Sequence, residues 1–157
     1  MPGGIFFAGE SKVWGGGIAF YNPFSTGESA ARGYLITFGQ LSDVVAQETW
    51  RPVKADLPLD VLETVELPVE RHWPLESQTY SSLLHVGDRE GVPMMTITSL
   101  QELTPTAPSG PYLRTMLDGL AEVLGWSLDQ RVRYLLAAPG ISPSWTAESL
   151  AALCESP

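Results

Sequence analysis

The stretch Ala31–Arg51 changes its apolar period part-way along, and this change limits what the chain can fold into. In its first half Tyr34, Ile36 and Phe38 alternate with residues that point the other way. Alternation with a period of two is typical of a strand, because successive side chains of a strand lie on opposite faces. We therefore expect a strand over Ala31–Phe38 that runs directly into a different element.

The second half of this stretch has helical spacing. Leu41, Val44 and Val45 stand at i, i+3 and i+4, and Glu48 falls on or beside the same apolar stripe. A carboxylate on the inward side of a short helix costs free energy unless it is paired or used. Glu48 is therefore the most informative titratable residue of the chain, and the alternative is a solvated Glu48 paired with Arg51.

The residues before this stretch predict two further strands. Gly4–Ala8 is a short apolar run, and Lys12–Tyr21 contains the glycine triplet Gly15–Gly17 ahead of a second apolar run. Such a triplet indicates a bulge or a close backbone approach, and lining a small-molecule site is the alternative. Asn22–Ser29 is rich in turn residues, so we expect the second strand to form a hairpin with Ala31–Phe38.

A second hairpin is expected in the middle of the chain. Thr79–Val86 and Val92–Thr98 are both β-like, and the residues between them, Gly87–Gly91, predict a turn. Thr49–Leu59 has two prolines and is expected to be irregular. Val61–Val69 is predicted as a strand with one solvent-exposed face.

The final third of the chain is predicted to be helical. A breaker-rich link at Thr104–Gly110 is followed by helices over Pro111–Gly125, over Ser127–Ala138 with a capping box, and over Ser142–Leu153. Strands first and helices last indicate an α+β fold with a barrel-like or strongly curled sheet. One domain over residues 1–157 is expected from the length.

Composition excludes some partners. The net charge is −9, and only 9 residues are Lys or Arg, so we expect neither a nucleic acid nor an anionic membrane surface as partner. No apolar run is long enough to span a membrane, and the first residues lack the basic region of a secretion signal. The one cysteine, Cys154, favours a reducing cytoplasmic setting and is interpreted as a small buried hydrophobe.

The standard catalytic motifs are missing from the sequence. There is no nucleophile elbow, no phosphate-binding glycine loop and no dinucleotide fingerprint. His72 and His85 lack metal-ligand spacing, so we expect no metal, and metal-dependent deacetylation has no ligand set. Proton transfer by a carboxylate in an apolar pocket is the chemistry that remains, and Glu48 is its candidate.

Three segments of the sequence resemble γ-glutamyl cyclotransferase-like proteins, and their residues are most similar in character to an actinobacterial-type subgroup. In GYLITFGQLSDVVAQE a strand runs into a short helix that ends in a glutamate, as in that family. The residues in matching places are Gly33, Tyr34, Ile36, Leu41, Val44 and Glu48. Pro108–Leu113 followed by Gly119 resembles the family's P-S-x-x-Y helix opening, and FAGESKVWGGGIAFYNP resembles its second and third strands.

The resemblance implies a small mixed β-barrel with flanking helices and an intramolecular aminolysis. The α-amine of a γ-glutamyl compound attacks the side-chain carbonyl, which releases 5-oxoproline and an amine without a cofactor. Glu48 would act as the general acid and base. Tyr112 would hydrogen-bond the substrate, or it is a packing aromatic at a helix start, and Gly16 and Gly17 would line the substrate site.

One departure from the family concerns its first strand. The family opens with a Y-G-S-N strand and loop whose backbone N–H groups hold the substrate, whereas this chain opens at Met1-Pro2-Gly3-Gly4, where the second strand is expected. A barrel without that strand would expose an unpaired edge, so we expect another copy of the chain or a rearranged terminus to cover it. The alternative function is a non-catalytic barrel that binds a small molecule or a protein.

Overall fold

The chain divides into two compact units in the computed structural model. The described residues are 1–53, 57–58 and 72–155. Unit 1 consists of Met1 and Ala31–Glu102, and unit 2 consists of Pro2–Ala30 and Leu103–Pro157. The single domain expected over residues 1–157 therefore stays a prediction.

The sheet of unit 1 is antiparallel and has the order β3-β4-β5. Its strands are β3 (Trp73–Pro74), β4 (Ser82–Arg89) and β5 (Val92–Thr98). Glu90 and Gly91 both have positive φ, 54° and 75°, as a two-residue turn that fits the right-handed strand twist requires. The hairpin predicted here is confirmed, although its first strand begins and ends about three residues later than expected.

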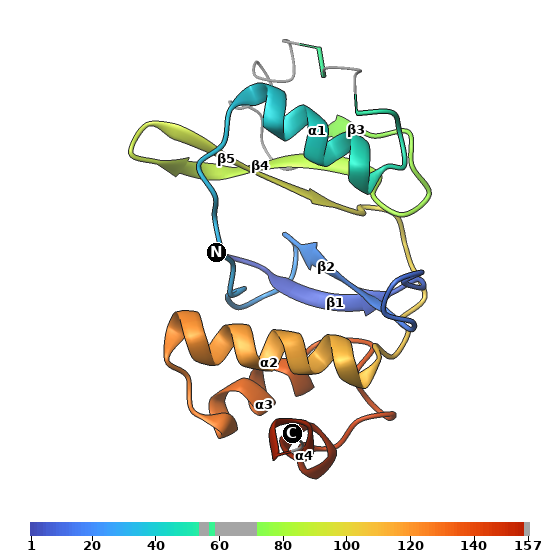
Figure 1. The fold of residues 1–157 in the computed structure, drawn as a ribbon, viewed down its shortest axis with the longest axis vertical. Helices are drawn as coiled ribbons and strands as arrows, with labels where there is room; N and C mark the ends of the chain where they lie inside the picture. The colour runs from blue at the N-terminus through green and yellow to red at the C-terminus, as the bar shows by residue number, and fades with distance from the viewer. Residues whose placement is uncertain (54–56, 59–71, 156–157) are drawn as a thin grey trace. The chain divides into compact units, whose positions relative to one another are not determined.

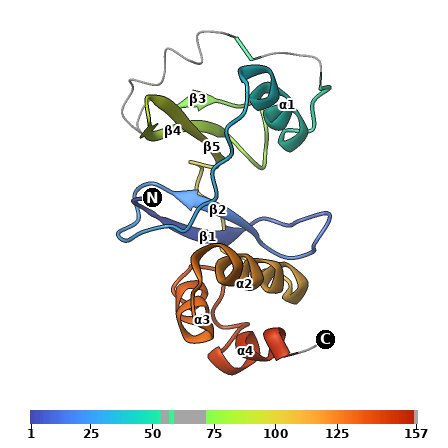
Figure 2. The same ribbon diagram turned by 60° about the vertical axis from the view of Figure 1, so that its left-hand side comes forward.

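Helix α1 (Phe38–Glu48) lies against this sheet in both ribbon views (Figures 1 and 2). A capping box starts the helix, because Thr37 accepts from the backbone N–H of Gln40 and the Gln40 side chain accepts from that of Thr37. The helix and sheet share a buried cluster of Val45, Leu57, Leu75 and Leu83. The predicted helix is confirmed.

The strand predicted over Ala31–Phe38 is wrong. Residues 31–37 form neither helix nor strand and are all exposed, with Tyr34 at 70% and Leu35 at 86%. An alternating apolar pattern forms a strand only where a partner strand accepts its backbone hydrogen bonds, and the expected partner pairs elsewhere. The hairpin predicted between the second strand and Ala31–Phe38 is therefore also wrong, because β2 (Ile18–Asn22) pairs with β1 (Gly4–Ala8).

The β1–β2 hairpin is the two-stranded sheet of unit 2. Phe6 lies directly opposite Phe20 in the register, and their rings stack at 5.3 Å between centroids. Phe7 points to the other face, as the strand period requires, and is fully buried. The strand predicted at Gly4–Ala8 is confirmed.

Three helices pack on the Phe7 face of this hairpin, and in both ribbon views α2 runs beneath β1 (Figures 1 and 2). They are α2 (Gly110–Leu124), α3 (Leu128–Leu136) and α4 (Ala147–Glu155). Gly125 ends α2 in the left-handed conformation, φ 64°, and a capping box opens α3, both as predicted. Helix α4 begins later than expected. The buried core consists of Phe7, Leu113, Leu117, Val132, Leu135, Ala138, Ile141 and Leu150.

The fold class is α+β with C-terminal helices, as predicted, but the predicted barrel is wrong for the described residues. Their strands form two separate small antiparallel sheets, and neither closes on itself. The strand predicted over Val61–Val69 lies outside the described residues. None of the helices in the described part of the chain is long and apolar enough to cross a membrane.

Replacement of Leu135 by alanine tests the core of unit 2. Leu135 is 0% exposed, so Leu135→Ala should lower the free energy of unfolding by about 2–5 kcal/mol. Leu124 is 43% exposed at the end of α2, and Leu124→Ala should lower it by less than about 1 kcal/mol. Urea unfolding followed by circular dichroism measures both, and equal losses would contradict this packing.

Candidate functional site

Glu48 is the last residue of α1, and its side chain is exposed. The buried face of α1 carries Ser42, Val45 and Ala46, whereas Val44 is 42% exposed. The apolar stripe expected through Val44 is therefore rotated by one position, and Glu48 follows Val44 one turn later on the exposed side. Glu48 lies beside the buried face and not on it.

The ion pair expected as the alternative role of Glu48 is not formed. Arg51 donates to the carboxylate of Glu76 instead. The Glu48 carboxylate has no hydrogen bond or ion pair with any residue in the described ranges. It is therefore accessible to a ligand from solvent.

Gly16 and Gly17 lie against the backbone of the segment that leads into α2. The Gly17 N–H donates to the carbonyl of Ala107 at 2.8 Å, and Gly16 forms a β-bridge with Pro108. A Cβ atom on Gly17 would overlap the carbonyl oxygen of Thr106, and Gly16 has a φ of +66°. The close backbone approach predicted at the triplet is confirmed, and it occupies the Gly17 N–H.

Tyr112 lies in the first turn of α2 and contacts β2 and Trp14. Its hydroxyl accepts from the Ala19 N–H at 3.4 Å, and its ring stacks on Trp14 at 5.8 Å between centroids. Phe7 contacts the same ring edge-on at 6.3 Å. These contacts give Tyr112 the packing role that was the alternative for it.

Three of the four predicted site residues lie in one unit. Gly16, Gly17 and Tyr112 belong to unit 2, whereas Glu48 belongs to unit 1. His85 binds Asp88, with 2.9 Å between Nε2 and Oδ1. Within the described residues no group of three or more His, Cys, Asp and Glu side chains is placed to hold a metal ion.

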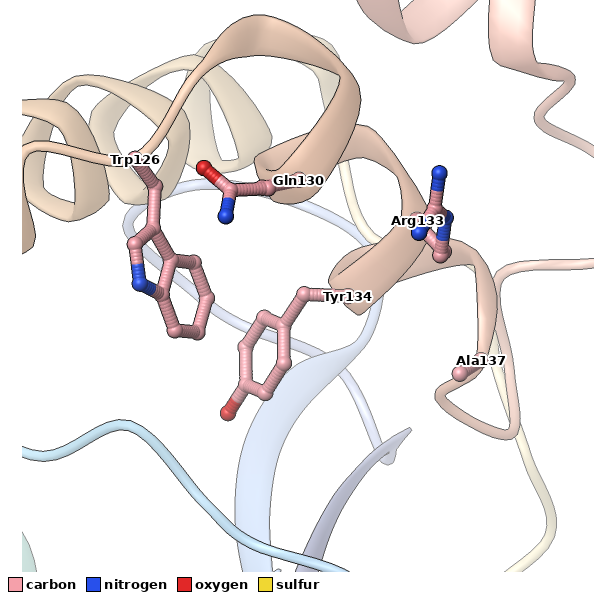
Figure 3. A pocket seen from close by; sticks show the side chains of 5 residues that line it. All are labelled: Trp126, Gln130, Arg133, Tyr134 and Ala137. Carbon is pink, nitrogen blue, oxygen red and sulfur yellow. The ribbon is translucent and has the colours of Figure 1, made fainter.

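A pocket that was not predicted lies on unit 2 (Figure 3). It has a volume of about 410 Å³ and is lined by Trp126, Gln130, Arg133, Tyr134 and Ala137. The last four residues stand at i, i+3, i+4 and i+7, so they share one face of α3 and its C-terminal continuation. The spacing is visible in the sequence, but an aromatic and polar helix face is usually a solvated one, and the sequence does not show that Trp126 lies beside it.

The ring of Tyr134 is fixed within this pocket. It meets Trp126 edge-on, with 5.3 Å between centroids and 67° between planes. Its hydroxyl accepts from the Ala30 N–H at 3.1 Å. Burial raises the pKa of Tyr134, and the hydrogen bonds from Ala30 and Ser29 oppose that rise.

Comparisons of the chain with protein-family models, with curated proteins and with solved structures gave no match. The resemblance to γ-glutamyl cyclotransferase-like proteins therefore stays a prediction that depends on the three sequence segments.

Substitution of two glycines should have opposite effects. Gly17→Ala should lower the free energy of unfolding by roughly 1–3 kcal/mol or more, because the added methyl overlaps the Thr106 carbonyl. Gly119 lies inside α2 with nothing within 4 Å of the added Cβ, so Gly119→Ala should raise it by roughly 0.5–1 kcal/mol. Denaturant unfolding measures both, and a stabilising Gly17→Ala would contradict the close approach.

Alkaline titration tests the environment of Tyr134. Because its pKa is raised in the folded chain, its contribution to stability is complete below the ordinary tyrosine pKa and is lost as the pH rises through the folded value. Tyrosinate absorbance should show late-ionising phenols from Tyr134 and from Tyr21, whose pKa burial also raises. Tyr134→Phe should remove part of this late component, and an unchanged titration would contradict the assignment.

Proposed function

We propose that the chain is a γ-glutamyl cyclotransferase-like enzyme that forms 5-oxoproline from a γ-glutamyl amide or peptide. The observation that carries the proposal is the Glu48 carboxylate. It stands where the family motif has its glutamate, is exposed at the end of α1 and has no partner among the residues that the structure describes.

The proposed chemistry needs one group that moves a proton. Glu48 takes a proton from the α-ammonium of the substrate, and the freed amine attacks the γ-carbonyl carbon. The C–N bond to the leaving amine then breaks, Glu48 returns its proton to that amine, and the ring nitrogen releases its second proton to solvent. Closure of a five-membered ring is favourable once the substrate is held folded, because both reacting groups belong to one molecule. No cofactor takes part in these steps.

Glu48 must be shielded from water for this role, because a carboxylate base works best where water is excluded. The proposal therefore requires that the bound substrate covers the exposed end of α1.

We place the activity in the cytoplasm, consistent with the one cysteine of the chain. Self-association over an open sheet edge stays a prediction.

A non-catalytic binding module is the second candidate. The packing of Tyr112 against Trp14 and Phe7 favours it, because a hydroxyl that already accepts from Ala19 has less capacity for a substrate. Under this candidate the chain binds a γ-glutamyl compound or a partner protein and releases no product.

Release of 5-oxoproline from a panel of γ-glutamyl amines and peptides distinguishes the two candidates. Wild-type protein should form it, and Glu48→Gln should lower kcat by about 10²-fold or more. Glu102→Gln is the matched control, since Glu102 is exposed in the same unit, and it should keep full activity. Equal activity of Glu48→Gln would exclude Glu48 as the acid–base group, and binding without product would support the module.

A further inference from the structure

The pocket of unit 2 carries an inference that does not depend on the proposed function. We propose that the Trp126 pocket, lined by Trp126, Gln130, Arg133, Tyr134 and Ala137, binds a small aromatic carboxylate. It has a volume of about 410 Å³ and is widely open to solvent, so a ligand would lie against its two rings and would not be enclosed. Its lining combines two aromatic rings with one cation and one amide.

The two rings of the pocket already contact each other before any ligand arrives. Trp126 and Tyr134 hold each other in an edge-to-face arrangement, and the Tyr134 hydroxyl is tied to the Ala30 N–H. Figure 3 shows both rings directed into the same space below α3. A flat apolar ligand can therefore bury its ring against them without ordering flexible side chains first, which favours affinity.

The polar part of the pocket selects an anion. Arg133 is exposed and forms no ion pair with a residue of the described ranges, and it is the only charged residue of the lining. A guanidinium binds a carboxylate through two parallel hydrogen bonds. In Figure 3 Arg133 lies at the edge opposite Trp126, and its side chain points away from the two rings. A ligand whose ring lies on Trp126 and Tyr134 must therefore extend to this edge to place its carboxylate at Arg133.

Gln130 adds a donor between the two ends. Its Oε1 accepts from the Ser127 N–H at 2.8 Å in the capping box of α3, which fixes the amide group. The Nε2 group is then the part of the amide that remains to donate to an acceptor in the pocket. The side chains of Gln130 and Arg133 therefore offer donors to the pocket, which favours an anionic ligand over a cationic one.

Arg133 also has a structural alternative. It lies in the last turn of α3, where a cation interacts favourably with the helix dipole. If this were its whole role, replacing it would lower stability and leave ligand binding unchanged. The two roles therefore predict different measurements.

The test is a titration of the ¹⁵N-labelled full chain with 3-phenylpropanoate, with the neutral 3-phenylpropanamide as ligand control. The indole N–H signal of Trp126, identified by its loss in Trp126→Phe, should move with the acid and much less with the amide. Arg133→Gln should raise the dissociation constant of the acid about tenfold or more. Arg114→Gln makes the same change on α2 of the same unit, outside the pocket, and should match wild type.

Three results would overturn the proposal. They are an unmoved Trp126 signal up to about 10 mM acid, equal binding of acid and amide, and an unchanged dissociation constant in Arg133→Gln. If Arg133→Gln does not fold, the comparison of acid with amide on the wild-type chain decides alone.

Discussion

Close backbone contacts join the β1–β2 hairpin of unit 2 to the segments around Thr106 and Pro139. The Gly17 backbone lies against that of Thr106 and donates to Ala107. Phe7 is tied on both sides, since its N–H donates to the Pro139 carbonyl at 2.8 Å and its carbonyl accepts from Thr106 at 2.9 Å. These contacts fix the Phe7 side chain in the core beneath the hairpin, and the helices pack around it.

Elements with a local signal were predictable from the sequence. The capping box of Ser127 and Gln130 starts α3, and Gly125 ends α2, because both depend on residues within one turn of the helix end. The strand at Val92–Thr98 was also correct, because a turn of special φ/ψ precedes it. The same kind of signal, Thr37 followed by Gln40, marks the start of α1 and was overlooked.

Partners that are distant in the sequence were not predictable in this way. The residues from Ala31 to Thr37 alternate like a strand, but β2 pairs with β1 and the alternating residues remain exposed. The predicted inward orientation of Glu48 is wrong for a related reason. Leu41, Val44 and Val45 fit a helix period, yet which side of α1 is buried depends on the sheet that it meets, and that side carries Ser42 and Ala46.

The candidate site shares this limit. Tyr112 and Gly17 were chosen from separate motifs and do lie in one unit, but contacts within the fold already use both residues.

A crystal structure of Glu48→Gln protein with a γ-glutamyl amide tests the central claim most directly. The account predicts the substrate α-nitrogen within about 3 Å of the side chain at position 48. A ligand bound elsewhere, with the end of α1 empty, would contradict it.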